Sequence, residues 1–319
     1  MPRAHANGID LEYEEFGDRD APVILLIMGL AAQLIHWPDE FCVQLAQQGF
    51  RVIRFDNRDV GLSSKMDHLG KPNVMRAALL STLRLPFRAP YKLDDLAHDA
   101  LALLDALKIK TAHLCGASMG GMIAQIIAAK HPERCRSLTL VMTTSGNPWL
   151  PRPKLAVQLR LVRRPTHFDR DSLIAHSMQT WRMIGSPGYA PTDEALRKRI
   201  AHAFDRGYHP RGIARQTVAI LASGSRVRLL KQIRTRTLVI HGKDDALVPV
   251  AAAHELARRI EGARLEVIPG WGHDFPPQLV SRLAHLVAGH ARKSEHAHGN
   301  ELKPSARKSS KPEPAATRT

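Results

Sequence analysis

The sequence predicts an α/β fold in which a mostly parallel sheet is covered by helices on both faces. Short apolar runs of strand length alternate along the chain with longer segments whose apolar residues recur at helical spacing. This alternation is typical of β-α-β units, in which successive strands run parallel. At 319 residues the chain can bury a full core without disulfides or metal ions. The predicted strands are Val23–Met28, Arg51–Phe55, Ala112–Cys115, Ser137–Met142, Thr237–His241 and Leu265–Ile268, and the predicted helices are Pro38–Gln48, Leu93–Leu107, Met119–Lys130, Val250–Ile260 and Leu279–Ala288.

An antiparallel hairpin is expected before the first of these strands. Asn7-Gly8 stands among strand-forming residues between Ala6 and Phe16. Asn-Gly pairs favour the left-handed backbone conformations that two-residue hairpin turns require. The sheet should therefore begin with antiparallel strands and continue as a parallel one.

One long interval interrupts the alternation of strands and helices. From residue 146 to 234, proline-rich stretches join helical segments such as Arg170–Met183 and Asp193–Phe204. We predict a helical lid inserted after the sixth strand, so that the core comprises residues 1–145 and 235–290. Residues 291–319 contain almost no large apolar residue, and burial cannot offset the entropy of ordering them. They are expected to form a disordered basic tail.

The positive charge of the chain is concentrated in the predicted lid. The formal net charge is +16, and residues 146–236 contain 18 Lys/Arg against 5 Asp/Glu, a net of +13. No RNA-binding aromatic signature, helix-turn-helix spacing or zinc finger accompanies these charges, so no nucleic-acid partner is expected. A solvated basic surface is the simplest interpretation. Attraction of an anionic substrate or of an acidic carrier protein is the alternative.

The composition also predicts the cellular compartment and argues against a bound metal or cofactor. Cys42, Cys115 and Cys135 are widely spaced and include no Cys-x-x-Cys pair, which argues against a disulfide framework and a zinc site. No other metal-ligand spacing is present, and we expect neither a metal nor a cofactor. Residues 1–20 lack an apolar core of signal-peptide length, and Val23–Met28 is too short to cross a bilayer. The protein is expected in the cytoplasm without a membrane partner.

A nucleophile motif lies between a predicted strand and a predicted helix. Gly116-Ala117-Ser118-Met119-Gly120 follows the strand that ends at Cys115 and precedes the helix that begins at Met119. Small residues permit the sharp turn that projects a serine hydroxyl clear of the sheet. Such a turn also aims the next backbone N–H at a developing oxyanion. Ser118 is therefore the candidate nucleophile.

Two later loops supply an acid and a base in the order that such a serine requires. Asp244 and Asp245 follow the strand Thr237–His241, and His273 follows the strand Leu265–Ile268. Loops at the carboxyl ends of parallel strands meet at one edge of the sheet. His273 would take the serine proton while a carboxylate fixes its tautomer. From position alone, either aspartate could reach the histidine.

A second oxyanion donor is expected in the loop after Val23–Met28. Gly29 permits a turn that would expose the N–H of Leu30. Together with the N–H of Met119, it would provide two donors for a tetrahedral intermediate.

These residues resemble the α/β-hydrolase fold enzymes, and among them small bacterial esterases similar to aclacinomycin methylesterase. The resemblance rests on the following segments: Leu25–Gly29, Trp37–Phe41, Val52–Ser63, Gly116–Met122 and the Asp245 and His273 loops. It implies a serine-histidine-acid triad without a cofactor. In this family the acid typically precedes the proline of an Asp-x-x-Val-Pro pattern by four residues, which matches Asp245 and Pro249 and selects Asp245 over Asp244. The usual His-Gly before the oxyanion loop is Met28-Gly29 here.

Three hypotheses for function follow. The first is hydrolysis of a small-molecule carboxylic ester, with a methyl ester as one candidate, through an acyl-enzyme. Relatives that open epoxides or remove halides have an aspartate where this chain has Ser118, which disfavours those reactions. The second is hydrolysis of acyl esters on an acidic carrier protein docked by the basic lid. The third is a hydrolase-fold binding protein without catalysis.

Overall fold

The computed structural model describes residues 2–163 and 165–301 and is built around one eight-stranded sheet. The strand order is β1-β2-β4-β3-β5-β6-β7-β8, in which β2 pairs antiparallel with β1 and β4 and all other neighbours are parallel. The α/β fold is therefore confirmed. The strands are β1 (Arg3–Ala6), β2 (Ile9–Phe16), β3 (Val23–Ile27), β4 (Arg51–Phe55), β5 (Ala112–Ala117), β6 (Cys135–Val141), β7 (Thr237–Gly242) and β8 (Arg264–Ile268).

The N-terminal hairpin forms as predicted. Asn7 and Gly8 connect β1 and β2 with φ angles of 53° and 74°. Both angles are left-handed, which matches the right-handed twist of the paired strands. Asparagine and glycine tolerate this region better than residues with larger or branched side chains.

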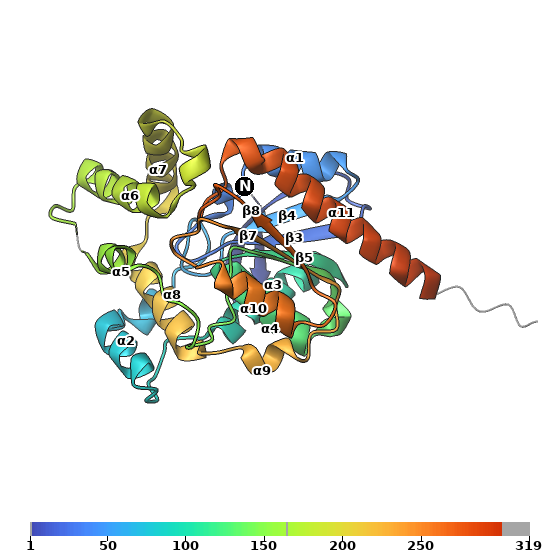
Figure 1. Ribbon diagram of the computed structural model, residues 1–319, viewed down its shortest axis with the longest axis horizontal. Coiled ribbons are helices and arrows are strands. Elements are labelled where there is room, and N and C mark those ends of the chain that lie inside the picture. Colours follow the sequence, from blue (N-terminus) through green and yellow to red (C-terminus); the bar gives the residue numbers. More distant parts are fainter. Residues whose placement is uncertain (1, 164, 302–319) are drawn as a thin grey trace, which may run out of the picture.

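Helices cover both faces of the sheet (Figure 1). Along β3, Ile24 and Leu26 join the core on one face, whereas Leu25 and Ile27 join the core on the other, because successive side chains of a strand alternate. Helices α1 (Asp39–Gln47) and α11 (Pro277–Glu301) cover the first face, and α3 (Leu93–Ala106), α4 (Met119–Lys130) and α10 (Ala251–Arg259) cover the second.

Between β6 and β7 the chain forms a helical insertion. Ile174, Met178, Leu196 and Ile200 form a small separate core between its two longest helices. The insertion comprises α5 (Leu155–Val162), α6 (Arg170–Ile184), α7 (Asp193–Gly207), α8 (Pro210–Ser223) and α9 (Val227–Leu230). We call this insertion the lid.

Helix α2 (Val74–Thr82) lies beside α8 and was not predicted from the sequence. The side chain of Asn73 caps its first turn by accepting a hydrogen bond from the N–H of Arg76 at 3.0 Å. Short 3₁₀ turns complete the described elements: Leu34–His36, Asp67–Leu69, Pro132–Arg134 and Pro187–Tyr189.

Buried ion pairs anchor the lid to the core. Arg215 of α8 donates to both carboxylate oxygens of Asp59, at 2.8 and 2.7 Å, and both side chains are buried. The Tyr91 hydroxyl donates to the same carboxylate at 2.7 Å. Arg206 of α7 pairs with buried Asp56 at 2.7 Å. Removing one partner of such a pair leaves an uncompensated buried charge, which typically costs about 3–5 kcal/mol of folding free energy.

The predicted start of the disordered tail is wrong. Helix α11 continues through Ala291 to Glu301, and Ala291 and Ser294 are buried. The Glu295 carboxylate lies 2.9 Å from Nε2 of His113 and 2.7 Å from the Arg136 guanidinium. Small and charged residues can therefore extend this helix, because the core already presents a surface and a cation for them. The rest of the predicted tail, residues 302–319, lies outside the described residues.

Within the described ranges, no helix combines the length and apolar composition needed to cross a membrane.

Candidate active site

The Ser118 turn has the strained geometry expected of a nucleophile elbow. Ser118 has φ 53° and ψ −118°, directly between β5 and α4. A Cβ atom at Gly116 would lie 2.3 Å from the carbonyl oxygen of Gly120, and one at Gly120 would lie 1.9 Å from that of Ile27. Only glycine fits at these two positions. The main chain of Ser118 is held by its N–H, which donates to the Val141 carbonyl at 3.0 Å, and by the Thr143 hydroxyl, which donates to its carbonyl at 2.6 Å.

Asp245 and His273 are in direct contact. Nδ1 of His273 lies 2.7 Å from Oδ2 of Asp245, and both side chains are buried. Oδ1 of Asp245 accepts the backbone N–H groups of Leu247 and Val248 at 2.9 and 2.7 Å. These hydrogen bonds orient the carboxylate toward the imidazole. The structure thus brings His273 together with Asp245, the aspartate that the family pattern selected.

Asp244 faces away from the histidine side chain. Its Oδ2 accepts the N–H of Gly270 at 2.7 Å, and the residue is exposed. It therefore supports the start of the His273 loop without touching the imidazole.

His241, another histidine near the acid, is fully buried and bonded to the Val248 carbonyl at 2.8 Å. Burial lowers its pKa and favours the neutral ring, despite the opposing effect of Asp245. Its Nε2 also lies 3.5 Å from Oδ2 of Asp245, so the neutral ring packs behind the candidate acid.

Ser118 lies at the same edge of the sheet as Asp245 and His273. Ala117 pairs with Val141, Val141 with Ile240, and Gly242 with Ile268, so the carboxyl ends of β5 to β8 are aligned. The hydrogen bonds among the described residues do not include one between the Ser118 hydroxyl and His273. Such contacts are often long in enzymes without substrate and shorten in the reacting complex.

The two predicted oxyanion donors flank Ser118. A Cβ atom at Gly29 would lie 3.0 Å from the Ser118 Cβ, so the loop after β3 passes directly over the nucleophile. Within the described chain, the backbone N–H groups of Leu30 and Met119 donate no hydrogen bond. Met119 begins a helix, where an unpaired N–H and the helix dipole favour negative charge.

Side chains from the Val52–Ser63 segment and from the lid hold the oxyanion loop. The Asn57 amide donates to the Met28 carbonyl at 3.0 Å. The Asp56 carboxylate accepts the Leu34 N–H at 2.7 Å. Gln216 of α8 accepts the Ala31 N–H at 3.0 Å. The position of this loop therefore depends on the lid as well as on the core.

The lid also holds the His273 loop, through residues that sequence reasoning missed. The Ser186 hydroxyl donates to the carboxylate of Asp274, and the Ser186 N–H donates to the same oxygen at 3.1 Å. The hydroxyl oxygen accepts the Gly272 N–H at 3.0 Å, and the His273 N–H donates to the Ile184 carbonyl at 2.7 Å. Ser186 thus joins residues on both sides of the candidate base.

Paired glycines allow the two backbones to touch. A Cβ atom at Gly272 would lie 2.3 Å from the Gly185 carbonyl oxygen, and one at Gly188 would lie 2.9 Å from the Gly270 Cα. Burial raises the pKa of Asp274, although the Ser186 hydrogen bonds and the charge of Arg199 act in the opposite direction. The only local sequence signals were the adjacency of Asp274 to His273 and a Gly-Ser-Pro-Gly stretch in the lid.

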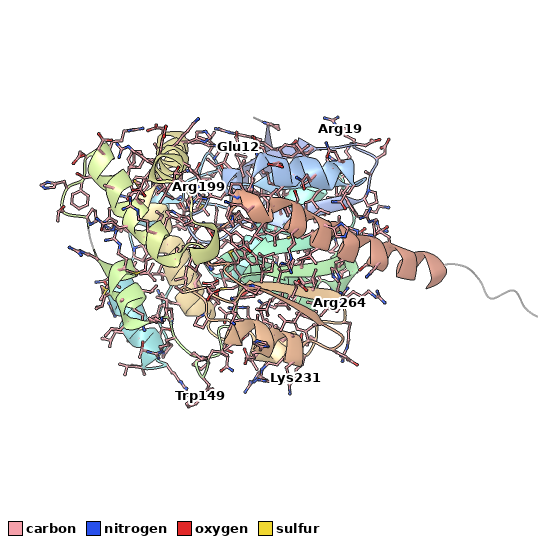
Figure 2. The ribbon with its side chains drawn as sticks, turned by 45° about the horizontal axis from the view of Figure 1, so that its top comes forward. Glu12, Arg19, Trp149, Arg199, Lys231 and Arg264 are labelled. Carbon is pink, nitrogen blue, oxygen red and sulfur yellow. The ribbon has the colours of Figure 1, made fainter. Side chains whose placement is uncertain are left out.

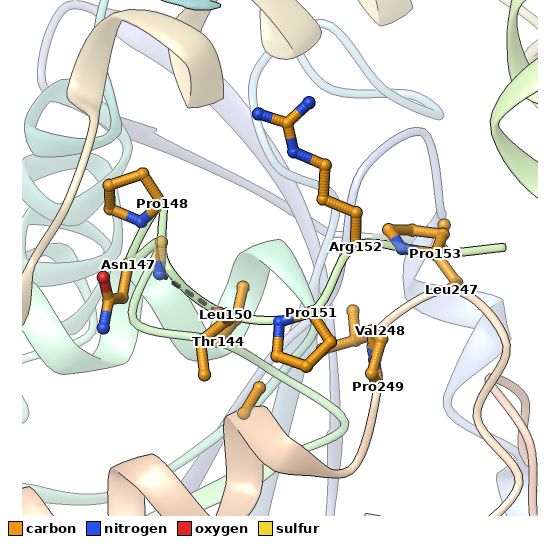
Figure 3. A pocket seen from close by; sticks show the side chains of 12 residues that line it. Thr144, Asn147, Pro148, Leu150, Pro151, Arg152, Pro153, Leu247, Val248 and Pro249 are labelled. Carbon is orange, nitrogen blue, oxygen red and sulfur yellow. Dashed lines mark hydrogen bonds between the residues drawn. The ribbon is translucent and has the colours of Figure 1, made fainter. Parts of the chain in front are cut away.

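A hollow of about 270 Å³ opens beside the site, between the segment after β6 and the loop after β7 (Figure 3). Thr144 in its wall follows Thr143, which bonds Ser118, and Val248 in its wall donates to Asp245. The hollow therefore borders the loop that carries Asp245 and the segment after β6, which holds the main chain of Ser118 through Thr143. Its lining is mostly apolar: Thr144, Gly146, Asn147, Pro148, Leu150, Pro151, Arg152, Pro153, Leu247, Val248, Pro249 and Ala252.

Comparison with known proteins identifies the family. Residues 22–178 match the model of the alpha/beta hydrolase fold family. The chain is 31% identical over 307 residues to rhodomycin D methylesterase DnrP of Streptomyces peucetius, covering 89% of this chain and 95% of the relative. The chain belongs to the α/β-hydrolase family. It is also 27% identical over 268 residues to 3-oxoadipate enol-lactonase 2 of Acinetobacter baylyi, covering 82% of this chain and 86% of the relative.

Solved structures share the architecture of this family member. The enol-lactonase from Burkholderia xenovorans LB400 superimposes with a TM-score of 0.69 at 24% identity, covering 91% of this chain and 100% of that one. The meta-cleavage product hydrolase CumD from Pseudomonas fluorescens IP01 superimposes with a TM-score of 0.72 at 19% identity, covering 92% and 98%. At these identities the likeness establishes the fold alone.

Proposed function

We propose that this α/β hydrolase cleaves carboxylic esters through an acyl-enzyme, with Ser118 as nucleophile, His273 as base and Asp245 as the acid that orients the base. The observation that carries the proposal is the 2.7 Å contact between His273 Nδ1 and the Asp245 carboxylate, at the sheet edge where Ser118 occupies a strained turn. Rhodomycin D methylesterase and 3-oxoadipate enol-lactonase 2, the two similar proteins described above, are hydrolases of an ester and a lactone by name.

The proposed reaction follows from the roles of these atoms. His273 Nε2 takes the proton as the Ser118 hydroxyl attacks the ester carbonyl, and Asp245 stabilises the resulting imidazolium. The N–H groups of Leu30 and Met119 stabilise the oxyanion. Collapse of the tetrahedral intermediate releases the alcohol, which receives the proton from His273. Water then attacks the acyl-enzyme with His273 again as base. The carboxylic acid leaves as His273 returns the proton to the Ser118 oxygen.

A methyl ester of a larger apolar acid is the substrate that we propose. The methylesterase relative supports the methyl group. The mostly apolar hollow between the Asp245 loop and the segment after β6 offers a place for the larger half of the ester. The three cysteines are free and buried, which suits a reducing compartment, and we propose the cytoplasm.

Hydrolysis of an ester carried by an acidic protein is the second candidate. It is favoured by the net charge of +13 over residues 146–236. A preference for carrier-bound over free ester that disappears at high salt would support it, and equal turnover of the two would oppose it.

Ser118→Ala tests the proposed function. The variant should lose ester turnover by roughly 10³-fold or more, because no other group supplies the nucleophile. A fluorophosphonate probe should label the wild type covalently and leave Ser118→Ala unlabelled. Ser177→Ala is the matched control, since the Ser177 hydroxyl only donates to the Leu173 carbonyl within α6. An unlabelled, inactive wild type would instead indicate a binding protein.

A further inference from the structure

Exposed apolar side chains gather at one end of the molecule. Of the fifteen large apolar residues that are exposed among the described residues, ten belong to segments 70–92 and 146–168. The first segment contains α2, and the second contains the chain leading into and out of α5. Figures 1 and 2 both show α2 and α5 side by side, at the end of the molecule away from the C-terminus of α11. The Arg84 guanidinium lies 5.2 Å from the Trp149 ring centre and joins the two segments.

The apolar stripe of α2 faces solvent. Met75, Leu79 and Leu83 recur at a spacing of four residues and are 57–62% exposed, whereas Ala77 is buried. A helix of a soluble domain ordinarily turns such a stripe toward the core.

Helix α5 has the same inverted orientation, and specific contacts hold it there. Leu155, Leu159 and Val162 are 58–68% exposed on its outer side. On its inner side Val157 is buried, and the Arg160 guanidinium donates to the Thr180 hydroxyl and the His176 carbonyl of α6. The outward direction of the leucines is thus fixed by hydrogen bonds on the opposite side of the helix.

Segments 70–92 and 146–168 also carry a one-sided charge. Together they contain ten lysines and arginines and no aspartate or glutamate. Eight of these cations are exposed, among them Arg76, Arg88 and Lys154, and none of the eight forms an ion pair with another described residue. We call the exposed side chains of the two segments the basic apolar face.

We propose that the basic apolar face docks this protein on an anionic lipid membrane. Protruding aliphatic side chains, an 81% exposed tryptophan and surrounding lysines and arginines are the features with which interfacial helices bind anionic lipid. A second copy of the chain fits poorly, because a symmetric contact would set the eight exposed positive charges of one face against the eight of another. Anionic headgroups complement these charges, and acyl chains accept the leucines.

The proposal replaces our expectation of no membrane partner. That expectation depended on the absence of an apolar run long enough to span a bilayer. Interfacial binding needs no such run and depends on which side of a helix is exposed. The segment between Thr144 and Lys154 borders both the face and the hollow beside the candidate active site, so an apolar ester dissolved in lipid would have a short path to the site.

Vesicle flotation tests the proposal independently of catalysis. Wild type and Ser118→Ala should both float with vesicles containing about 30% phosphatidylglycerol, and neither should float with pure phosphatidylcholine. Raising the salt from about 0.05 to about 0.5 M should weaken the binding, since it shortens the screening length. Absence of binding to anionic vesicles, or equal binding to both compositions, would overturn the proposal.

Matched variants locate the surface. Replacement of Arg76, Arg88 and Lys154 by glutamine should lower the partition coefficient roughly 100-fold, at about fivefold for each cation. The same replacement of Arg19, Lys231 and Arg258, which are exposed elsewhere (Arg19 and Lys231 are labelled in Figure 2), should change it much less. Equal losses in the two triple variants would overturn the assignment of the face.

Apolar variants and fluorescence complete the test. Leu79→Ser with Leu159→Ser should weaken binding at least about 10-fold, and Val43→Ser with Leu69→Ser, exposed on other elements, should not. Trp149 fluorescence should shift to shorter wavelength on binding, and Trp149→Phe should abolish that shift. A Leu79→Ser/Leu159→Ser variant that binds vesicles as tightly as the wild type would contradict the proposal. Sedimentation showing that the basic apolar face mediates dimer formation, without vesicle binding, would also contradict it.

Discussion

Ser118 illustrates how backbone strain and chemistry are joined in a single residue. Its positive φ is unfavourable for a residue with a side chain and costs of order 1–3 kcal/mol. The surrounding structure enforces it, because Gly116 and Gly120 allow close contacts that any Cβ would block. The same strain points the hydroxyl out of the sheet.

The two neighbouring aspartates should differ sharply when each is replaced by asparagine. Asp245→Asn should lower kcat severely, by roughly 10⁴-fold if it acts as triad acids do elsewhere, since the amide favours the wrong imidazole tautomer. Asp244→Asn should have little effect, because the Asp244 carboxylate accepts the Gly270 N–H, which an asparagine oxygen can also do. Steady-state kinetics on one ester compares them. A larger loss at Asp244 would refute the assignment.

Ser186 is expected to position His273 from the lid. Ser186→Ala removes a donor to Asp274 and the acceptor of the Gly272 N–H. Small displacement of the base should lower kcat roughly 10- to 100-fold with little change in KM. Ser177→Ala, in the same lid, should retain wild-type kcat. An unchanged kcat and an unchanged pH profile of kcat/KM in Ser186→Ala would show that the loop is held without this hydroxyl.

At the scale of single elements, α11 shows that composition alone misjudges where a helix ends. Residues 291–301 lack large apolar side chains, yet Ala291 and Ser294 are buried against a surface that the core provides. Glu295 completes a pair of contacts with His113 and Arg136 of β5 and β6. Small or charged side chains can therefore stabilise the end of a helix even though they bury little apolar area.

Truncating the chain at two points should separate the contribution of residues 291–301 to stability from that of the residues beyond them. A chain ending at His290 loses Ala291, Ser294 and the Glu295 contacts, and its Tm should fall by roughly 3–8 °C. A chain ending at Glu301 should melt within about 1 °C of the wild type. Calorimetry of both proteins gives the comparison. Equal melting of the shorter chain and the wild type would mean that these contacts contribute nothing in solution.

At the scale of the whole molecule, the lid contacts two of the loops that form the candidate site. Gln216 holds the oxyanion loop, Ser186 holds the His273 loop, and Arg215 and Arg206 fasten the lid to the core through Asp59 and Asp56. The lid therefore helps to position the oxyanion loop and the proposed base.

The positive charge of the lid should raise catalytic efficiency toward anionic esters. Helix α7 carries three successive basic residues, Arg197, Lys198 and Arg199. Arg197 pairs with Asp171, whereas the charge of Arg199 lowers the pKa of Asp274 beside His273, against the effect of burial. The kcat/KM of an ester with a carboxylate should fall as salt rises, while that of its isosteric amide stays constant.

Single and combined variants identify which basic residue of α7 attracts the anionic ester. At low salt, Arg199→Gln should reduce the difference in kcat/KM between the two esters severalfold. Joint replacement of Arg197, Lys198 and Arg199 should do the same. Arg197→Gln should not. If the wild type treats both esters alike at every salt concentration, the lid charge does not steer substrate.

What the sequence determined by itself is local. The hairpin, the strands and the Gly-x-Ser-x-Gly turn depend on residues a few positions apart, so spacing and residue type were sufficient to predict them. The candidates Ser118, Asp245 and His273 followed from motifs at strand ends, although the choice between Asp244 and Asp245 needed a family pattern. Their catalytic roles remain predictions.

What only the tertiary structure decided depends on contacts between distant residues. Ser186 and Asp274 are 88 positions apart, and Asp59 and Arg215 are 156 apart, and no local pattern encodes such pairs. The same holds for the end of α11 and for the outward stripes of α2 and α5. Helical periodicity shows that an apolar stripe exists, but the direction in which it faces is set by whatever the other side of the helix packs against.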